Sequence, residues 1–436
     1  MSAPRDAFES IVTEIPGPRS RDLAARLAGV EARGVTYLGP EFPVFWESAA
    51  GALVTDVDGN RYLDLTSAFG VAATGHTNPR VAAAAADQAQ RLIHGMGDVH
   101  PTEVRVRLLE RLAEIAPGNL CKSYLATSGA EAVEFALKTA LLATGKPRAL
   151  AFVGAYHGLS LGALELAGIE RFRQPFAPLV AERATFLPFP NAATPLDTAL
   201  DAVRAALAHD PAIGAVVAEP VQGRGGVIVP PAAWLRGLRA LCDEHGALLV
   251  LDEIYTGFGR TGTMFACERE GVAPDLMCLG KALAGGVPLS ATIGTARAMD
   301  AWPRSTGEAL HTSTFLGNPL ACAAALANLD ELARLDVVGR VRAREKLLGE
   351  RLGRLRAVPA VRDVRGLGFL WAVEFSGAEL ANRVVVRALA RGLILLQSGT
   401  SGTSITIAPP LVVADDQLAR ALDVFERTVH ETREER

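Results

Sequence analysis

Short apolar runs alternate with longer stretches of helical periodicity between about residues 115 and 295. The runs that read as buried strands are 148–153, 214–218, 247–252 and 276–279. Helical patterns lie between them, such as 130–143, which stops near Gly145, and 232–245, which stops at Gly246. Strands that alternate with helices of this length predict an α/β fold with a mostly parallel sheet covered on both faces.

The two ends of the chain show a different pattern. Residues 51–65 predict a hairpin, with Asp58-Gly59 as the turn signal. After Pro319 we expect one long helix, then an apolar strand over 366–375 and a final helix from about Asp415. The Ser/Gly/Thr run 398–404 reads as a loop. These features predict a separate, smaller α+β part.

Composition narrows the class of protein. The chain has 436 residues, 49% of them hydrophobic, and a net charge of -4. This length allows two to three domains at roughly 150 residues each, and the apolar content supports a large core. Without a Lys/Arg block, neither nucleic acid nor an anionic membrane is expected as a partner.

The cysteines and the N-terminus bear on the compartment. Five scattered cysteines, an odd number without a CxxC pair, favour reduced and mostly buried thiols over a disulfide framework. Residues 1–20 have no apolar signal-like stretch, and no apolar run reaches 18 residues. We therefore expect a soluble, cytoplasmic protein, and no metal site is predicted.

A possible anion seat precedes the helical pattern at 130–143. Ser128 and Glu131 have capping-box spacing, which places a helix N-terminus at Thr127-Ser128-Gly129-Ala130. The free N–H groups and the positive end of the helix dipole would suit a phosphate. Taken alone, the segment is more typical of an ordinary capped helix than of a phosphate site.

Two charged residues follow predicted strands. Asp252 ends the run at 247–252, at the strand edge where open α/β sheets place ligands. A buried carboxylate needs a cation, such as a protonated pyridine nitrogen, or else it caps a neighbouring loop. Lys281, one of five lysines, follows the run at 276–279 among small residues, where a desolvated amine would suit Schiff-base chemistry. The order of phosphate seat, strand-end Asp and strand-end Lys predicts a pyridoxal phosphate (PLP) site.

Two other motifs point elsewhere but lack the required context. Residues 257–262 match GxGxxG, yet four residues separate Asp252 from Gly257 and no acidic residue ends a strand about 20 positions later. Residues 158–162 match the hydrolase motif GxSxG, but residues 154–157 intervene between the strand and the first Gly. We therefore expect neither a dinucleotide fold nor a nucleophilic Ser160.

From about Arg33 to the C-terminus the sequence resembles the class-III aminotransferases, which include the ornithine, acetylornithine and 4-aminobutyrate enzymes. The motifs that carry the resemblance occur in the family's order: Ser128-Gly129-Ala130-Glu131-Ala132, Tyr156-His157-Gly158, Glu219-Pro220-Val221-Gln222-Gly223, Asp252-Glu253-Ile254, Gly280-Lys281, and Ser313-Thr314-Phe315 with Gly317-Asn318-Pro319.

The resemblance implies a fold-type I PLP enzyme with a large domain built on a seven-stranded type of sheet. The implied division is a segment 1–75 that contributes to the small domain, a large PLP-binding domain 76–320, and a C-terminal small domain 321–436. It also implies a homodimer with shared active sites.

Roles carry over from the family to matching positions. Lys281 would hold PLP as a Schiff base and move the proton, Asp252 would pair with the ring nitrogen, and Tyr156 and Ile254 would cover the two ring faces. Other implied cofactor contacts are Ser128, Gly129, Ala130, His157, Glu219, Tyr255 and, from the partner subunit, Thr314.

The chain departs from the family pattern at three positions. Tyr255 stands where a Gln is common, and its hydroxyl could still donate to the cofactor. Arg224 replaces the Glu of Gln-Gly-Glu-Gly, and Thr406 replaces an Arg that binds the substrate's α-carboxylate in amino-acid-using members. Either Arg224 takes over carboxylate binding, the reading we favour, or it is a solvated loop residue and the amine substrate lacks that carboxylate.

The predicted reaction is a ping-pong transfer of an amino group from an amine or (ω-)amino acid to a 2-oxo acid through a Lys281 Schiff base. The alternatives on the same scaffold are an amino-acid racemase or epimerase, a decarboxylase or an aminomutase. A scaffold that binds PLP without turnover, or one without PLP, is the alternative of another class, and the intact Lys281/Asp252 pair argues against both.

Overall fold

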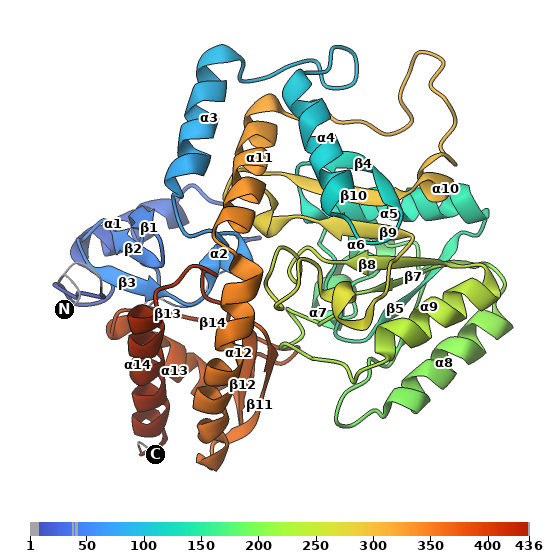
Figure 1. Ribbon diagram of the computed structural model, residues 1–436. Helices are drawn as coiled ribbons and strands as arrows, with labels where there is room; N and C mark the ends of the chain where they lie inside the picture. The colour runs from blue at the N-terminus through green and yellow to red at the C-terminus, as the bar shows by residue number, and fades with distance from the viewer. Residues whose placement is uncertain (1–7, 37–38, 40–41, 435–436) are drawn as a thin grey trace.

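A seven-stranded sheet forms the centre of the computed structural model, which describes residues 8–36, 39 and 42–434 (Figure 1). Within these residues its strand order is β4-β10-β9-β8-β7-β5-β6. The strands are β4 (Leu120–Ala126), β5 (Arg148–Phe152), β6 (Ala184–Leu187), β7 (Ile213–Ala218), β8 (Leu248–Asp252), β9 (Leu276–Leu279) and β10 (Ser290–Thr295). Only β10 runs antiparallel to its neighbours. The mostly parallel sheet predicted from the sequence is confirmed, and the four predicted strands lie within a residue of their expected bounds.

Helices cover both faces of this sheet because its strands are apolar on both sides. Leu249 and Leu251 of β8 join one core cluster, whereas Leu248 and Val250 join another. Helix α5 (Gly129–Thr144) covers the second side. The first side is covered by α4 (Glu103–Ile115), α8 (Leu196–His209) and α9 (Trp234–His245). The predicted helices at 130–143 and 232–245 correspond to α5 and α9.

The N-terminal and C-terminal segments share a second sheet. Its order is β1-β2-β3-β13, from β1 (Trp46–Ala50), β2 (Leu53–Asp56), β3 (Arg61–Asp64) and β13 (Leu393–Ile394). Strands β2 and β3 form the predicted hairpin with Asp58-Gly59 in its turn, and β13 pairs parallel with β3. Figure 1 shows these blue and red segments side by side. Both ends of the chain thus build the smaller part, while the divisions at residues 75 and 320 stay a proposal.

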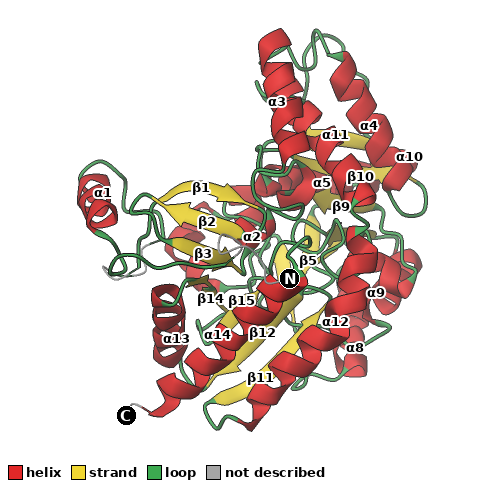
Figure 2. Ribbon diagram, turned by 60° about the vertical axis from the view of Figure 1, so that its left-hand side comes forward, coloured by secondary structure: helices red, strands yellow, loops and turns green. Residues whose placement is uncertain are grey.

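The third sheet belongs to the C-terminal part and has the order β11-β12-β15-β14. It contains β11 (Val361–Leu367), β12 (Leu370–Phe375), β14 (Leu396–Ser398) and β15 (Ser404–Ile407). Helices α13 (Ala378–Ala390) and α14 (Asp415–Glu434) accompany it (Figure 2). The predicted loop at 398–404 joins β14 to β15, and the predicted final helix is α14.

Two predictions for this part were wrong in detail. The expected long helix after Pro319 is two helices, α11 (Pro319–Arg334) and α12 (Val337–Gly353). The break falls at Asp336, whose φ is +44° and whose side chain accepts a bond from Gly339 N. The expected single strand over 366–375 is the hairpin β11–β12, because Gly368 turns the chain at φ +59°.

The remaining helices and the short 3₁₀ turns complete the fold. They are α1 (Pro18–Ala28), α2 (Ser67–Gly70), α3 (Pro79–Arg91), α6 (Leu161–Leu164), α7 (Glu170–Arg173), α10 (Ala296–Met299), η2 (Gln174–Leu179), η3 (Ala266–Glu270), η4 (Lys281–Leu283) and η5 (Arg354–Ala357). Among the helices that the structure describes, none has the length and apolar character of a transmembrane span. Four cysteines are buried and Cys121 is exposed, all as free thiols, as predicted.

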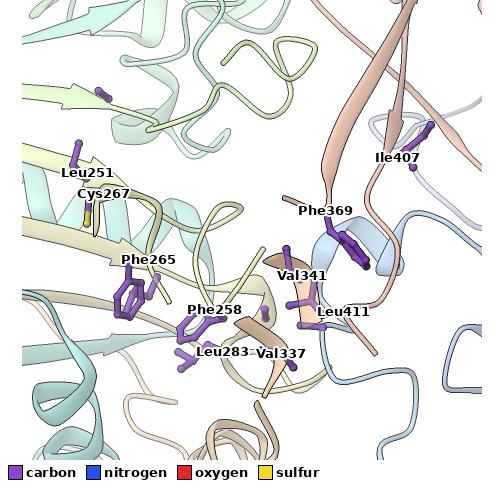
Figure 3. Close-up of a cluster of buried hydrophobic side chains, with 14 of the residues drawn as sticks. Leu251, Phe258, Phe265, Cys267, Leu283, Val337, Val341, Phe369, Ile407 and Leu411 are labelled. Carbon is purple, nitrogen blue, oxygen red and sulfur yellow. The ribbon is translucent and has the colours of Figure 1, made fainter. Parts of the chain in front are cut away.

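A buried apolar cluster joins the large sheet to the C-terminal part (Figure 3). It brings Leu251 of β8 together with Phe258 and Phe265 from the following loop. From the C-terminal part, Val337 of α12 and Leu411 belong to the same cluster. The glycine-rich segment 257–262 therefore lies in a packed joint between the two parts, in agreement with the rejection of a dinucleotide loop.

Candidate active site

The sequence-predicted residues converge at the carboxyl ends of four neighbouring parallel strands. Tyr156 follows β5, Glu219 follows β7, Asp252 ends β8, and Lys281 follows β9. All four line one cavity of about 730 Å³. Because parallel strands present their carboxyl ends at one edge of a sheet, separate motifs reach the same cavity.

The Asp252 carboxylate is almost completely buried and forms a pair with His157. The distance from Oδ2 to His157 Nδ1 is 2.8 Å, and Oδ1 accepts a bond from Ile254 N at 3.0 Å. Burial alone would lower the pKa of His157, but the hydrogen bond and charge of Asp252 outweigh it and raise the pKa. His157 Nε2 is buried without a partner among the described residues. The two hydrogen bonds fix the orientation of the Asp252 carboxylate in the cavity wall.

Glu219 positions the loops that follow β5 and β7. One carboxylate oxygen accepts the N–H of Tyr156 and the other accepts the N–H of Gly223, each at 2.9 Å. Burial raises the pKa of Glu219 to about 7, although these bonds and the nearby His157 act in the opposite direction. Glu219 thus lies beside the cavity and orients the backbone of two other site residues.

The Lys281 amine lies over the ring of Tyr255. Its Nζ is 4.4 Å from the ring centroid, and no hydrogen bond or ion pair to it is found within the described part of the chain. Burial lowers the pKa of Lys281, against the opposing charges of Asp252 and Glu219. Lys281 itself has a φ of +43°, a strained backbone conformation for a residue with a side chain. The result is a preorganised amine with a larger neutral, nucleophilic fraction.

The N-terminus of α5 opens onto the same cavity. Gly129 and Ala130 line it, and Gly158 packs so closely that an added Cβ would lie 2.6 Å from Ala130 Cβ. Ser128 Oγ accepts a bond from Glu131 N, as the capping-box spacing predicted. The Glu131 carboxylate bonds Thr127 N and Oγ1, however, so the reciprocal half of the box falls one residue earlier than expected.

Arg224 also faces the cavity and is half-buried. Its Nη1 donates to the Gln397 carbonyl at 3.3 Å, and its own carbonyl accepts from Gly399 N at 3.0 Å. Within the described residues the guanidinium has no carboxylate partner. Thr406, at the position of the family's arginine, lines the cavity too, and its hydroxyl donates to Ser398 Oγ at 2.6 Å.

Two predicted cofactor contacts do not line the cavity in this chain. Ser128 is exposed and serves as the cap of α5, next to the lining residues Gly129 and Ala130. Thr314 is exposed in the turn before α11. The remaining predicted contacts, His157, Ile254 and Tyr255, line the cavity as expected.

The GxSxG motif has a different use. Ser160 donates its hydroxyl to the Glu134 carboxylate, and Gly162 N donates to the same oxygen. This serine is exposed at the start of α6 and is absent from the cavity lining. The structure agrees with the rejection of a nucleophile elbow.

Several residues of the site were not found from the sequence. The cavity wall includes Arg171 and Phe172 of α7, Phe69 of α2, and Asn382 and Gln397 of the C-terminal part. Short helices and loops supply them, without a periodic signal. The Arg171-Phe172 pair after an apolar segment could at most have suggested an exposed turn.

Comparison with known proteins places this site in a family. A family model described as aminotransferase class-III matches residues 37–429 of the chain. The chain belongs to the class-III aminotransferase family. The 4-aminobutyrate aminotransferase of Mycobacterium leprae (strain TN) is 40% identical, over 96% of this chain and 97% of its own length. The putrescine aminotransferase of Pectobacterium atrosepticum is 39% identical, over 89% of this chain and 83% of its own.

The solved structures agree with this membership. An amine transaminase from an uncultivated Pseudomonas species, in its PLP-bound form, superposes with a TM-score of 0.85 at 30% identity. The match covers 92% of this chain and 99% of that one. The fold-type I architecture predicted for this class-III aminotransferase is therefore confirmed, and the protein is a PLP-dependent transaminase.

The site's own residues fit PLP. A buried carboxylate suits a protonated ring nitrogen, and the Lys281 amine suits the aldehyde. Gly129 N and Ala130 N, with no partner in the described part of the chain, open onto the cavity at the positive end of the 16-residue helix α5, which suits a phosphate dianion.

Proposed function

We propose that Lys281, Asp252 and Tyr156 form the catalytic set of this transaminase. The observation that carries the proposal is the placement of the Lys281 amine, facing the same cavity as the Asp252–His157 pair and the N-terminus of α5. When bound, PLP forms a Schiff base with an amine and acts as an electron sink for the adjoining carbon.

Each residue has a defined task in the proposed reaction. Lys281 Nζ would hold the cofactor and would take the proton from the substrate carbon that bears the amino group. Asp252 stabilises a proton on the ring nitrogen, and the His157 bond orients its carboxylate. Tyr156 and Ile254, which both line the cavity, would cover the two faces of the ring. Gly129 and Ala130, with Ser128 beside them, hold the phosphate.

The substrates are an amine or (ω-)amino acid donor and a 2-oxo acid acceptor. Arg224 is the proposed carboxylate-binding residue, supported by its cavity position and its lack of an acidic partner within the described residues. A guanidinium binds a carboxylate through two parallel hydrogen bonds. The relatives named above are a 4-aminobutyrate and a putrescine aminotransferase, so their names favour no single donor.

We further propose a cytoplasmic homodimer in which Thr314 of each subunit completes the phosphate site of the other. In support, Thr314 is exposed and does not reach the cavity of its own chain. The free thiols of the five cysteines suit a reducing compartment. Analytical sedimentation of the holoenzyme should show a dimer. The Thr314→Ala variant should lose bound cofactor more readily than the wild type on dialysis.

The deciding experiment is a visible spectrum of the holoenzyme during titration with amines and amino acids. A yellow band that donors bleach, with a stoichiometric oxo product, is expected for the wild type. Lys281→Ala should lose turnover while keeping the fold. A band that no donor bleaches would contradict transamination and would favour racemisation, decarboxylation or aminomutase chemistry. No band at all, even with added PLP, would refute the role of Lys281.

A further inference from the structure

Two arginines from different segments face the cavity that Lys281 and Asp252 share. Arg224 lies in the loop after β7, and Arg171 lies on α7. The Arg171 guanidinium carbon is 5.0 Å from the centroid of the Phe172 ring, which in turn packs edge-on against Tyr156. Arg171 thus lies beside the aromatic group that covers the cofactor position.

Neither arginine has an acidic partner in the part of the chain that the structure describes. The acidic residues in the cavity wall are Asp252, which is bonded to His157, and Glu219, which is bonded to two backbone N–H groups. The polar side chains that the C-terminal part contributes to the cavity wall are neutral, namely Asn382, Gln397, Ser398 and Thr406. This wall of the cavity is therefore cationic.

The two guanidinium groups also repel each other. Burial is the main cause that lowers the pKa of Arg224, and the charge of Arg171 lowers it further. Arg224 is half-buried and Arg171 is exposed, so solvent screens part of the repulsion, and the remainder raises the free energy of the unliganded site. A ligand with two negative charges would remove that repulsion, whereas a monoanion would neutralise one charge only.

We propose that Arg171 is a second substrate-binding cation, and that with Arg224 it selects dicarboxylic 2-oxo acids and amino acids over monocarboxylic ones. The proposal rests on the function argued above and specifies its substrate class. Arg224 binds one carboxylate near the reacting carbon. Arg171, exposed on α7 at the same cavity, binds the second.

The test uses the PLP holoenzyme with one amino donor that bleaches it and two acceptors, 2-oxoglutarate and pyruvate. In the wild type, kcat/KM for the dicarboxylate should exceed that for the monocarboxylate. In Arg171→Gln the ratio of the two constants should fall about tenfold, because one charge-assisted hydrogen bond is lost. Arg171→Lys, which keeps the charge, should restore part of the ratio.

Arg173→Gln is the matched control on the same helix. Its guanidinium lies over the Phe186 ring at 4.1 Å and donates to Ala167 O, and it does not line the cavity. The ratio should therefore stay at the wild-type value in this variant. An equal fall in the control would show a structural effect of α7 and overturn the proposal.

Two further outcomes separate this inference from the proposed function. A wild type that prefers pyruvate, or an Arg171→Gln variant with an unchanged ratio, overturns the role of Arg171 and leaves transamination intact. Arg224→Gln should raise KM for both acceptors. If it does not, the carboxylate role of Arg224 fails, and with it the two-arginine site.

Discussion

The ring of Tyr255 occupies a slot between two glycines beside the Lys281 amine. A Cβ added to Gly223 would lie 2.3 Å from Tyr255 Cδ1, and one added to Gly70 would lie 2.4 Å from Cε2. A tyrosine at this position, where the family often has Gln, therefore needs both glycines. The two glycines hold the Tyr255 ring 4.4 Å from the Lys281 amine, so a substitution at either glycine should also displace the groups around Lys281.

Gly223→Ala should displace Tyr255 and lower kcat. Overpacking of this kind costs about 1–3 kcal/mol of stability, so thermal unfolding of the holoenzyme should shift down as well. In the Tyr255→Gln background, Gly223→Ala should destabilise the protein by less than half as much, because the aromatic ring that the added methyl group would contact is gone. Gly377→Ala is the control, since its added Cβ meets nothing within 4 Å. Equal effects in both backgrounds would show that Gly223 acts through another contact.

At this scale the sequence predicted the residues that come from strand ends. Asp252 and Lys281 each follow an apolar run, and a strand end fixes where a side chain lies. The bond from His157 to Asp252 and the two bonds of Glu219 were not predicted. His157 and Asp252 are 95 residues apart, and Glu219 and Tyr156 are 63 residues apart, so the local sequence pattern carries no information on these bonds. The bond from Gly223 N to Glu219 depends on the conformation of a tight turn, which the sequence did not predict either.

The short element α2 is a left-handed turn at the cavity wall. Ser67, Ala68 and Phe69 have φ values of +49°, +48° and +63°, and Gly70 follows at +83°. Left-handed backbone costs roughly 1–2 kcal/mol for each residue that has a Cβ. The neighbouring Asp64 compensates, because its carboxylate accepts bonds from Thr66 N, Thr66 Oγ1 and Ala68 N.

Ala68→Val should destabilise the protein by about 1–2 kcal/mol, because a β-branched residue tolerates positive φ poorly. Ala68→Gly should be neutral or stabilising, since glycine adopts this conformation freely. The measurement is urea unfolding of the holoenzyme, with Ala205→Val on the exposed side of α8 as the control for helix propensity. Similar losses for the two valine variants would show that the turn is not strained.

Element boundaries were predicted well where a strong breaker stands alone. Gly145 and Gly246 end α5 and α9 at φ +68° and +62°, as their positions indicated. Asp336 breaks the α11–α12 pattern without such a signal, because an aspartate in left-handed conformation is set by its cap bond to Gly339 N. The left-handed turn of α2 could not be predicted from the sequence either, because Gly70 is its only residue that favours positive φ.

At the scale of the whole molecule, Arg260 joins three distant segments in a fully buried position. Its Nη1 donates to the Phe369 carbonyl at 3.1 Å and to the Pro409 carbonyl at 2.6 Å, and its Nη2 donates to Ser67 Oγ at 3.2 Å. Burial lowers its pKa to about 10, so it remains charged at neutral pH. The alternation of strands and helices predicted the large sheet, but it could not show how the two ends of the chain attach to it.

Arg260→Met should lower the free energy of unfolding by about 2–3 kcal/mol. The change removes three hydrogen bonds from a charged donor and leaves two buried carbonyls without partners, at about 1–3 kcal/mol each. Relief of the desolvation of the guanidinium offsets only part of this loss. Because Ser67 begins the left-handed turn, amide exchange over residues 67–70 should speed up more than exchange in α8. Arg427→Met, exposed on α14, is the control and should change neither quantity. Unfolding at the same urea concentration in both variants would show that the apolar cluster around Phe258 and Phe369 holds the two parts together without this arginine.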